Sequence, residues 1–145
     1  MVRPEYVKRK LHLIAEDLGR LAHFRDASLE KITGDFVKLA AVERMIERIV
    51  MRAIDVNEYL ISALATGQEE KIAWLMYRET FLRLSALDVY PAEFAERIAK
   101  SAGLRDILVH DYNDVDRRIV HGSIRSCLED YDRYVEAVDA FLERV

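Results

Sequence analysis

The sequence predicts an all-α protein, and two observations carry that prediction. Glycine and proline are sparse, at five and two in 145 residues, so few positions break or kink a helix. Long segments carry apolar residues three or four apart, as in an amphipathic helix, with almost no strict alternation of the strand type. With 51% apolar residues, the chain can bury a core of its own. We expect one domain over residues 1–145, because no repeat, low-complexity tract or linker divides the chain.

The apolar spacing sets the first three helices. We expect the first from about Glu5 to Arg25 and a long second one from about Asp35 to Ala65. The second should end near Gly67, because glycine readily adopts the left-handed conformation that terminates helices. A shorter helix is expected near Tyr77 to Leu87. The stretches 26–34 and 66–76 are expected to be loops.

Two further helices follow. Pro91 suits a helix N-terminus, because its fixed φ and missing N–H are tolerated there, and the helix it begins should end near Gly103. Asn113 or Asp114 is expected to cap a last long helix. The apolar stripe of that helix is expected to be Val115, Ile119, Ile124, Leu128, Tyr131, Val135, Val138 and Leu142.

The charge balance limits the kinds of partner. The 22 basic and 26 acidic residues give a net charge of −4, which argues against bulk attraction to nucleic acid, so a nucleic-acid site must be local. One candidate is the row Arg44, Arg48 and Arg52, whose spacing of four places them on one stripe of a helix. The alternative, favoured for the row taken alone, is a solvated face in which Glu43 and Glu47 form ion pairs with these arginines.

Neither a membrane nor an oxidising compartment is indicated. No apolar run approaches the ~20 residues of a membrane span, and the start of the chain lacks the apolar stretch of a secretory signal. We therefore expect a cytoplasmic protein. Cys127 is the single cysteine, so it has no partner for an internal disulfide or a zinc site, and we interpret it as a buried small apolar residue.

The segment from Arg105 to Tyr112 is the strongest candidate for chemistry. It brings Arg105, His110 and Tyr112 into eight residues. Arginine offers a fixed fork of donors that suits phosphate oxygens, and histidine exchanges protons near neutral pH. These residue types are suited to cutting a phosphodiester without a metal.

The order R-x4-H-x-Y, preceded by Gly103 and Leu104, resembles the HEPN superfamily and, within it, the HepT toxins. The segments 41–44 through 55–57, the block 77–81 and the start of the last helix at 115–116 resemble the HepT pattern in the same order. The likeness covers roughly residues 5 to 142.

The resemblance implies a HEPN-type helical bundle that forms a homodimer, or a higher assembly of dimers, with the motif lining a cleft between protomers. It also implies RNA cleavage in which His110 takes the proton from the ribose 2′-OH and Arg105 stabilises the charge on the phosphorane. The products would be a 2′,3′-cyclic phosphate and a 5′-OH end. Residues five apart on a regular helix are separated by about 140° around its axis, so Arg105 and His110 do not meet on a straight helix. Either the helix ends near Val109 and His110 turns back, or two copies of the motif face each other, as the resemblance implies.

The resemblance further implies a type VII toxin–antitoxin pair. The partner would be an MntA-type nucleotidyltransferase antitoxin, which would transfer AMP to Tyr112 and silence the toxin. In the commonest family pattern asparagine follows the arginine, whereas this chain has Asp106. A carboxylate there would repel RNA unless it is paired with Arg105 or another cation. Asp55 lies within a family-like segment and either orients site residues or pairs with Arg52.

Other functions are less well supported. His110 and Asp111 form an HD dipeptide, but His12 and His23 fall on the first helix as packing or surface residues, and no histidine has a glutamate three residues earlier, as di-iron bundles require. We therefore expect no metal and no cofactor. The alternative is a non-catalytic HEPN module that docks a nucleotidyltransferase or binds a nucleotide, which Asp106 favours. A purely structural helical adaptor leaves the motif unexplained.

Overall fold

The computed structural model describes residues 2–64, 75–110 and 116–145, except the side chains of residues 109 and 110. Every element in these ranges is helical, in agreement with the all-α prediction. The helices are α1 (Pro4–Leu21), α2 (Leu29–Thr33), α3 (Phe36–Ala63), α4 (Tyr77–Ala86), α5 (Ala92–His110) and α6 (Arg117–Arg144), with a short 3-10 turn, η1 (Ala22–Phe24), after α1.

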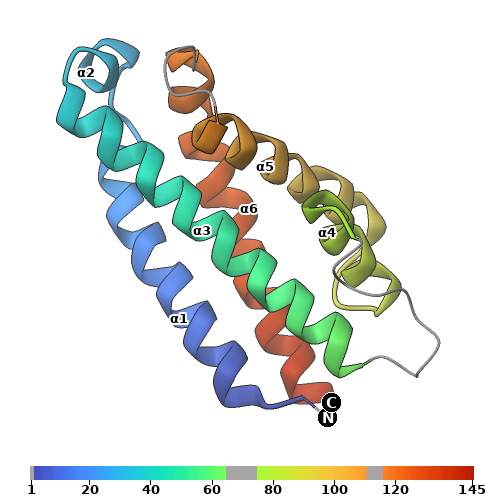
Figure 1. Ribbon diagram of the computed structural model, residues 1–145. Coiled ribbons are helices and arrows are strands. Elements are labelled where there is room, and N and C mark those ends of the chain that lie inside the picture. Colours follow the sequence, from blue (N-terminus) through green and yellow to red (C-terminus); the bar gives the residue numbers. More distant parts are fainter. Residues whose placement is uncertain (1, 65–74, 111–115) are drawn as a thin grey trace.

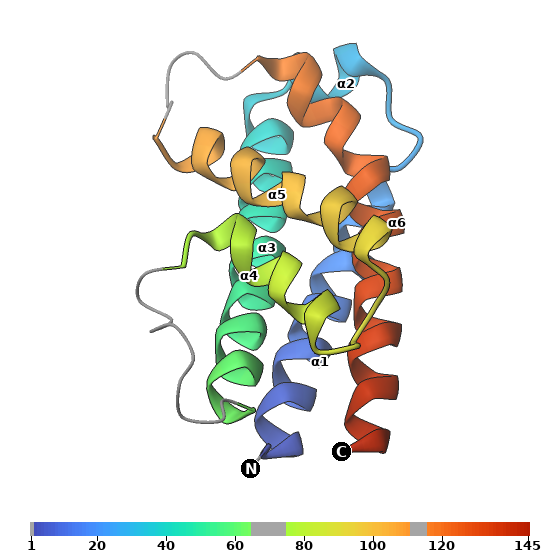
Figure 2. The same ribbon diagram turned by 90° about the vertical axis from the view of Figure 1, so that its right-hand side faces the viewer.

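The three long helices form the body of the bundle. In Figure 1, α1 and α3 run antiparallel beside each other, α6 lies alongside them, and both chain termini lie at the same end. The pair α4 and α5 packs on α3, and Figure 2 shows these two helices crossing the body obliquely. None of the described helices has the length and apolar character needed to cross a membrane.

The core is the apolar stripe of each long helix, as the spacing predicts. From α1 it receives Val7, Leu11, Ile14, Leu18 and Leu21, and from α6 it receives Ile124, Leu128, Tyr131, Val138 and Leu142, among others. An aromatic cluster fills its centre, where Phe81 of α4 lies edge-on to Tyr131 and Tyr134 of α6, at ring-centroid distances of 6.5 and 6.2 Å. Such pairs add to the hydrophobic stabilisation from buried area.

Local capping explains where several helices begin. The carboxylate of Asp35 accepts hydrogen bonds from the backbone N–H groups of Val37 and Lys38 at 2.9 and 3.2 Å, which satisfies two donors at the first turn of α3. The expected start and length of this helix are confirmed. The short helix α4 also lies where the spacing predicted it.

Three expectations about the fold are wrong. The stretch 26–34 contains α2, a single turn capped by Ser28, rather than a loop only. Helix α5 does not end near Gly103 but continues to His110, since glycine inside a helix costs only about 1 kcal/mol. The cap of α6 is Asp116, whose carboxylate accepts from the N–H of Arg118 at 2.9 Å. Asn113 and Asp114, the predicted caps, lie outside the described residues.

The apolar stripe of α6 also differs at its beginning. Ile119 was expected to be buried, but 46% of it is exposed. It lies in the first turn of α6, directly before Val120, which is fully buried. Val115 of the predicted stripe and the predicted terminator Gly67 lie outside the described residues. The exposed Ile119 therefore marks a surface at the end of the molecule where α5 finishes.

Candidate functional site

Arg105 lies on the last turns of α5, and its guanidinium is only weakly satisfied. Its side chain is 17% exposed, and the nearest carboxylate contact joins Nη1 to Oδ1 of Asp106 at 3.5 Å, the limit for a hydrogen bond. Its Nε is buried and has no partner in the described part of the chain. Buried donors are nearly always paired in folded proteins. Arg105 therefore places a positive charge at a fixed position, and its Nε–H group lacks an acceptor. Both properties suit a binding site for an anion.

An aromatic ring supports this arginine. The Cζ atom of Arg105 lies 5.4 Å from the centroid of Tyr77, within the range of a cation–π interaction. Tyr77 is the first residue of α4, so the N-terminal turn of that helix packs against the motif-bearing end of α5. The guanidinium is consequently positioned by a ring, and its Nε–H has no acceptor among the described residues.

Around these two side chains is a cavity of about 520 Å³, here called the α4–α5 pocket. Its size falls in the range of roughly 300–1,000 Å³ typical of small-molecule sites. Apolar surface comes from Met76, which is 70% exposed, and from neighbouring residues, while Arg78 adds a second cation. The complete lining is Leu75, Met76, Tyr77, Arg78, Ala102, Gly103, Arg105 and Asp106.

A buried polar network fixes α4 in this position. The Thr80 hydroxyl donates to the backbone carbonyl of Tyr77 at 2.7 Å and accepts from the amide of Asn57 at 3.1 Å. The Asn57 oxygen accepts in turn from the hydroxyl of Tyr134 at 2.6 Å. Asn57, Thr80 and Tyr134 are fully buried, so this network joins α3, α4 and α6. The sequence reasoning missed its role; the available signal was an asparagine on the apolar face of a predicted helix.

The remaining motif residues are described only in part. His110 is the last residue of α5, and Tyr112 lies outside the described residues. Because the helix continues through His110, the backbone positions of Arg105 and His110 are separated by about 140° around the axis of α5. The two positions therefore do not share one face of the helix. Asp106 is 57% exposed and lines the α4–α5 pocket.

The arginine row of α3 is engaged in ion pairs within the fold. Arg48 and Arg52 contact the carboxylate of Asp17 on α1 at 3.3 and 2.7 Å, and the Asp17 side chain is only 1% exposed. Arg44 pairs with Glu47 at 3.0 Å on the surface. The row therefore does not form one solvated stripe, since two of its members bind α1 to α3.

Asp55 also joins these two helices. Its carboxylate contacts the ammonium of Lys10 at 3.1 Å. Arg52, the partner that helical spacing suggested, is directed to Asp17 instead. Asp55 is thus placed between α1 and α3, away from the α4–α5 pocket.

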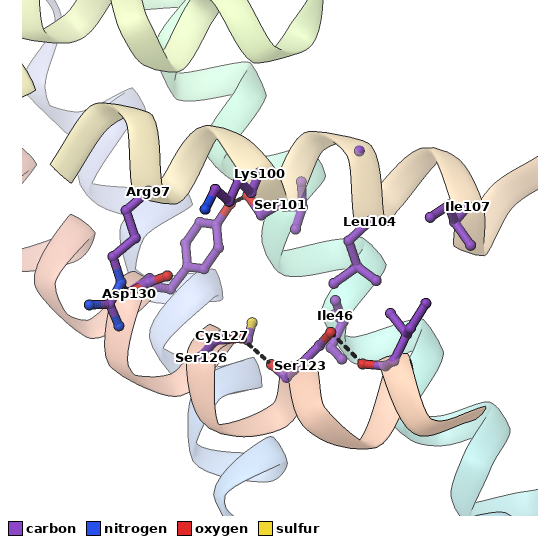
Figure 3. Close-up of a pocket in the computed structure, with 14 residues that line it drawn as sticks. Ile46, Arg97, Lys100, Ser101, Leu104, Ile107, Ser123, Ser126, Cys127 and Asp130 are labelled. Atoms are coloured by element: carbon purple, nitrogen blue, oxygen red, sulfur yellow. Dashed lines mark hydrogen bonds and ion pairs between the residues drawn. The ribbon is translucent and has the colours of Figure 1, made fainter. Parts of the chain in front are cut away.

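A second cavity of about 510 Å³ lies on the other side of the motif helix, here called the α5–α6 groove. Its apolar surface comes mainly from Leu104, Ile107 and Ile119 together with Ile46 and Val50 of α3. Figure 3 shows Leu104 directed from α5 into the space above Ser123 and Cys127 of α6. The groove is therefore continuous with the helix that carries the motif, and Gly103 lines both cavities.

Polar side chains close one end of this groove. Arg97 contacts Asp130 at 2.7 Å (Figure 3), and the hydroxyls of Ser101 and Tyr131 lie 2.6 Å apart. Burial raises the pKa of Asp130, and the positive charge of Arg97 partly offsets that rise. Cys127 is buried as predicted, and burial raises the pKa of its thiol.

Metal ligands are not clustered in the described part of the chain, where no group of three or more His, Cys, Asp or Glu side chains could hold an ion. His12 is exposed and lies 3.4 Å from Glu16. His121 contacts the carbonyl oxygen of Ala27 at 2.7 Å. Both histidines are accounted for by local contacts.

The helical bundle with an arginine–histidine motif on its fifth helix is a HEPN-type domain. Residues 14–138 match the model of the family described as ribonuclease HepT-like, and the chain belongs to this family. It is 31% identical over 141 residues to the tRNA nuclease HepT of Aphanizomenon flos-aquae, in an alignment that covers 97% of this chain and 92% of that protein. It is 25% identical over 144 residues to a putative RNase of Archaeoglobus fulgidus, covering 99% and 98% of the two chains.

Solved structures share the fold. The tri-AMPylated HEPN toxin of Shewanella oneidensis, in complex with its MNT antitoxin, superposes with a TM-score of 0.75 at 23% identity, covering 92% of this chain and 96% of that one. The cytosolic protein YutE of Bacillus subtilis gives 0.79 at 14% identity, covering 99% and 92%. At these identities the likeness establishes the bundle and its helix order.

Proposed function

We propose that this protein is a metal-independent RNA endonuclease acting in the cytoplasm as the toxin of a type VII toxin–antitoxin pair. The observation that supports it most directly is Arg105, whose buried Nε lacks a partner in the described residues at the edge of a pocket on the motif helix. A phosphate oxygen is the acceptor that such a guanidinium binds best. The nuclease named among the relatives supports the same substrate class.

The proposed reaction is transesterification. His110 removes the proton from the 2′-OH and the 2′ oxygen attacks the adjacent phosphorus. The bond from phosphorus to the 5′ oxygen of the next nucleotide then breaks, and that oxygen takes a proton from water. Arg105 stabilises the negative charge that grows on the non-bridging oxygens. The products are a 2′,3′-cyclic phosphate and a 5′-OH end, and DNA is inert because it lacks the nucleophile.

We further propose that two copies of the chain build the site. Arg105 and His110 occupy different sides of α5, so a phosphate held by one copy would meet the histidine of the other across a two-fold axis. The α5–α6 groove, with Ile119 46% exposed, supplies apolar surface beside the motif for such an interface.

Regulation is proposed to act at Tyr112. An MntA-type nucleotidyltransferase would attach AMP to its hydroxyl, and the added phosphate would occupy Arg105 and repel the RNA backbone. The AMPylated HEPN toxin seen in complex with an MNT antitoxin supports this partner.

The second candidate, a non-catalytic module that docks a nucleotidyltransferase or binds a nucleotide, is favoured by one observation, the exposed carboxylate of Asp106 beside Arg105.

Cleavage is tested with purified protein and RNA in excess EDTA. The wild-type chain should cut RNA and leave cyclic phosphate ends, whereas Arg105→Ala and His110→Ala should fold normally and lose cleavage and toxicity. Arg9→Ala, at an exposed position of α1 outside the lining of both cavities, serves as a matched control that keeps both. Loss of cleavage in EDTA and its return with a divalent ion would contradict the metal-independent reaction.

The two-copy site predicts complementation. Arg105→Ala protein mixed with His110→Ala protein should regain activity, because a mixed dimer contains one site with both residues intact. No recovery in a mixture shown by mass spectrometry to contain mixed dimers would place both residues in one protomer.

Modification is tested by co-expression with the cognate nucleotidyltransferase. Intact mass and peptide mapping should find one or more AMP units on Tyr112, and Tyr112→Phe should stay toxic while resisting neutralisation. A fully neutralised pair with unmodified Tyr112 would leave stoichiometric binding as the antitoxin mechanism.

A further inference from the structure

The carboxylate of Asp106 is the feature of the α4–α5 pocket that phosphate binding does not explain. Asp106 is 57% exposed, and its only contact with Arg105 among the described residues is the one at 3.5 Å. Such a carboxylate repels a phosphate held by the same arginine. A ligand that carries hydrogen-bond donors beside its phosphate would satisfy this carboxylate.

The lining of the α4–α5 pocket contains both cationic groups and a hydrogen-bond acceptor, together with apolar surface. Arg105 and Arg78 supply cations, Asp106 supplies an acceptor pair, exposed Met76 supplies apolar surface, and half-buried Tyr77 supplies an aromatic ring. A nucleotide has the matching parts, namely a phosphate, a flat base that packs on aromatic and apolar side chains, and a polar base edge. The pocket volume of about 520 Å³ is large enough for such a ligand.

We infer that the α4–α5 pocket is a nucleobase subsite and that Asp106 selects guanine. This inference rests on the proposed ribonuclease function. A carboxylate only accepts hydrogen bonds, so it favours a base that presents two donors side by side. Guanine does so with N1–H and the N2 amino group. Adenine and cytosine place an acceptor nitrogen beside their amino group, and uracil flanks its single N–H with two carbonyls.

The position of Asp106 next to Arg105 in the chain gives this selection a consequence for cleavage. The phosphate bound by Arg105 would be one attached to the selected guanosine, so RNA would be cut beside guanosines. The carboxylate would be neutralised in the complex by the donors of the base as well as by Arg105. Asp106 acts here as a specificity residue, while Arg105 remains the residue that contacts the phosphate.

Binding of nucleoside monophosphates tests the inference without requiring cleavage. The full-length protein is titrated by calorimetry with the 3′ and 5′ monophosphates of guanosine, adenosine, cytidine and uridine, none of which contains a scissile diester. Guanosine should bind tighter than the other three by roughly 10- to 100-fold in at least one series, the discrimination expected of one bidentate contact to a base. Equal affinities for the four nucleosides in both series would overturn the inference, whether or not the protein cuts RNA.

Asp106→Asn supplies the second measurement. The amide donates as well as accepts, so the guanosine preference should fall at least about 10-fold and adenosine should gain. Asp139→Asn, at an exposed position of α6 outside the pocket lining, should keep the preference. A preference that survives in Asp106→Asn would exclude Asp106 as its source. Wild-type protein that cuts RNA without regard to guanosine would disprove the guanine subsite and leave the ribonuclease proposal intact. Selective guanosine binding without any RNA cleavage would support the subsite and contradict the ribonuclease proposal.

Discussion

Replacing Arg52 with glutamine separates a structural role of the α3 arginines from a role in binding RNA. The Nη1 atom of Arg52 donates to Asp17 at 2.7 Å and lies 3.4 Å from the carbonyl oxygen of Leu13. A hydrogen bond to a charged group contributes about 1.5–3 kcal/mol. Arg20 and Arg48 remain on Asp17 at 2.9 and 3.3 Å in the variant, so the lower part of this range applies.

We therefore expect Arg52→Gln to lower the free energy of unfolding by about 1.5–2 kcal/mol, which for a domain of this size is a fall in Tm of roughly 3–8 °C. Arg44→Gln in the same row is the matched control. Arg44 is 65% exposed, and within the described part of the chain it pairs with Glu47 at the surface, so its loss should cost less than about 0.5 kcal/mol.

The assay is urea unfolding followed by circular dichroism at one fixed protein concentration, because assembly of subunits would otherwise change the apparent stability. RNA affinity and RNA cleavage are measured on the same samples at a temperature where each variant is folded. Equal stability of Arg52→Gln and Arg44→Gln would refute the structural role. A folded Arg52→Gln protein with reduced RNA affinity would restore the arginine row as an RNA contact.

Three further predictions concern stability. Tyr134→Phe leaves the buried oxygen of Asn57 without its 2.6 Å donor and should cost about 1–3 kcal/mol in urea unfolding; a neutral effect would mean that the network contributes little. Gly103→Ala should raise stability by about 0.5–1 kcal/mol, because its Cβ would meet nothing within 4 Å and alanine favours the helix; a loss would reveal an unseen contact. For Asp116, its hydrogen bonds to Arg118 lower the pKa, so its stabilising effect is present above the ordinary carboxyl pKa and is lost as pH falls through the lowered value. Asp116→Ala should accordingly melt below wild type at neutral pH and converge with it in acid, and a gap that persists in acid would contradict this sign.

Much of the fold follows from local patterns in the sequence. The apolar spacing located α1, α3, α4 and most of α6, and it placed the start of α3 at about Asp35, which the structure shows to be the N-cap. The end of α5 was misplaced because Gly103 was taken as a helix terminator. The free-energy cost of one glycine inside a helix is small compared with the stabilisation that the helix gains from its buried side chains. Ile119 was misplaced because helical spacing shows which face is apolar but not where the neighbouring helix ends.

The candidate site was predictable in its chemistry and less so in its surroundings. The motif spacing singled out Arg105, but Tyr77 lies 28 positions earlier and meets it only through tertiary packing. The same holds for the contact of Arg52 with Asp17, at a sequence separation of 35. Contacts of this kind depend on the relative rotation of packed helices, which no pattern within one helix records.

The network of Asn57, Thr80 and Tyr134 has a consequence for how many arrangements the bundle permits. Each group satisfies the next only when α3, α4 and α6 stand at one axial position and one rotation. Apolar side chains tolerate sliding along a helix, but a buried amide that loses its partners incurs the full desolvation penalty. The hydrogen bonds of Asn57 thus fix the axial position of the ten-residue helix α4 and make arrangements in which α4 is shifted less stable. They therefore keep Tyr77 against Arg105 in a single arrangement.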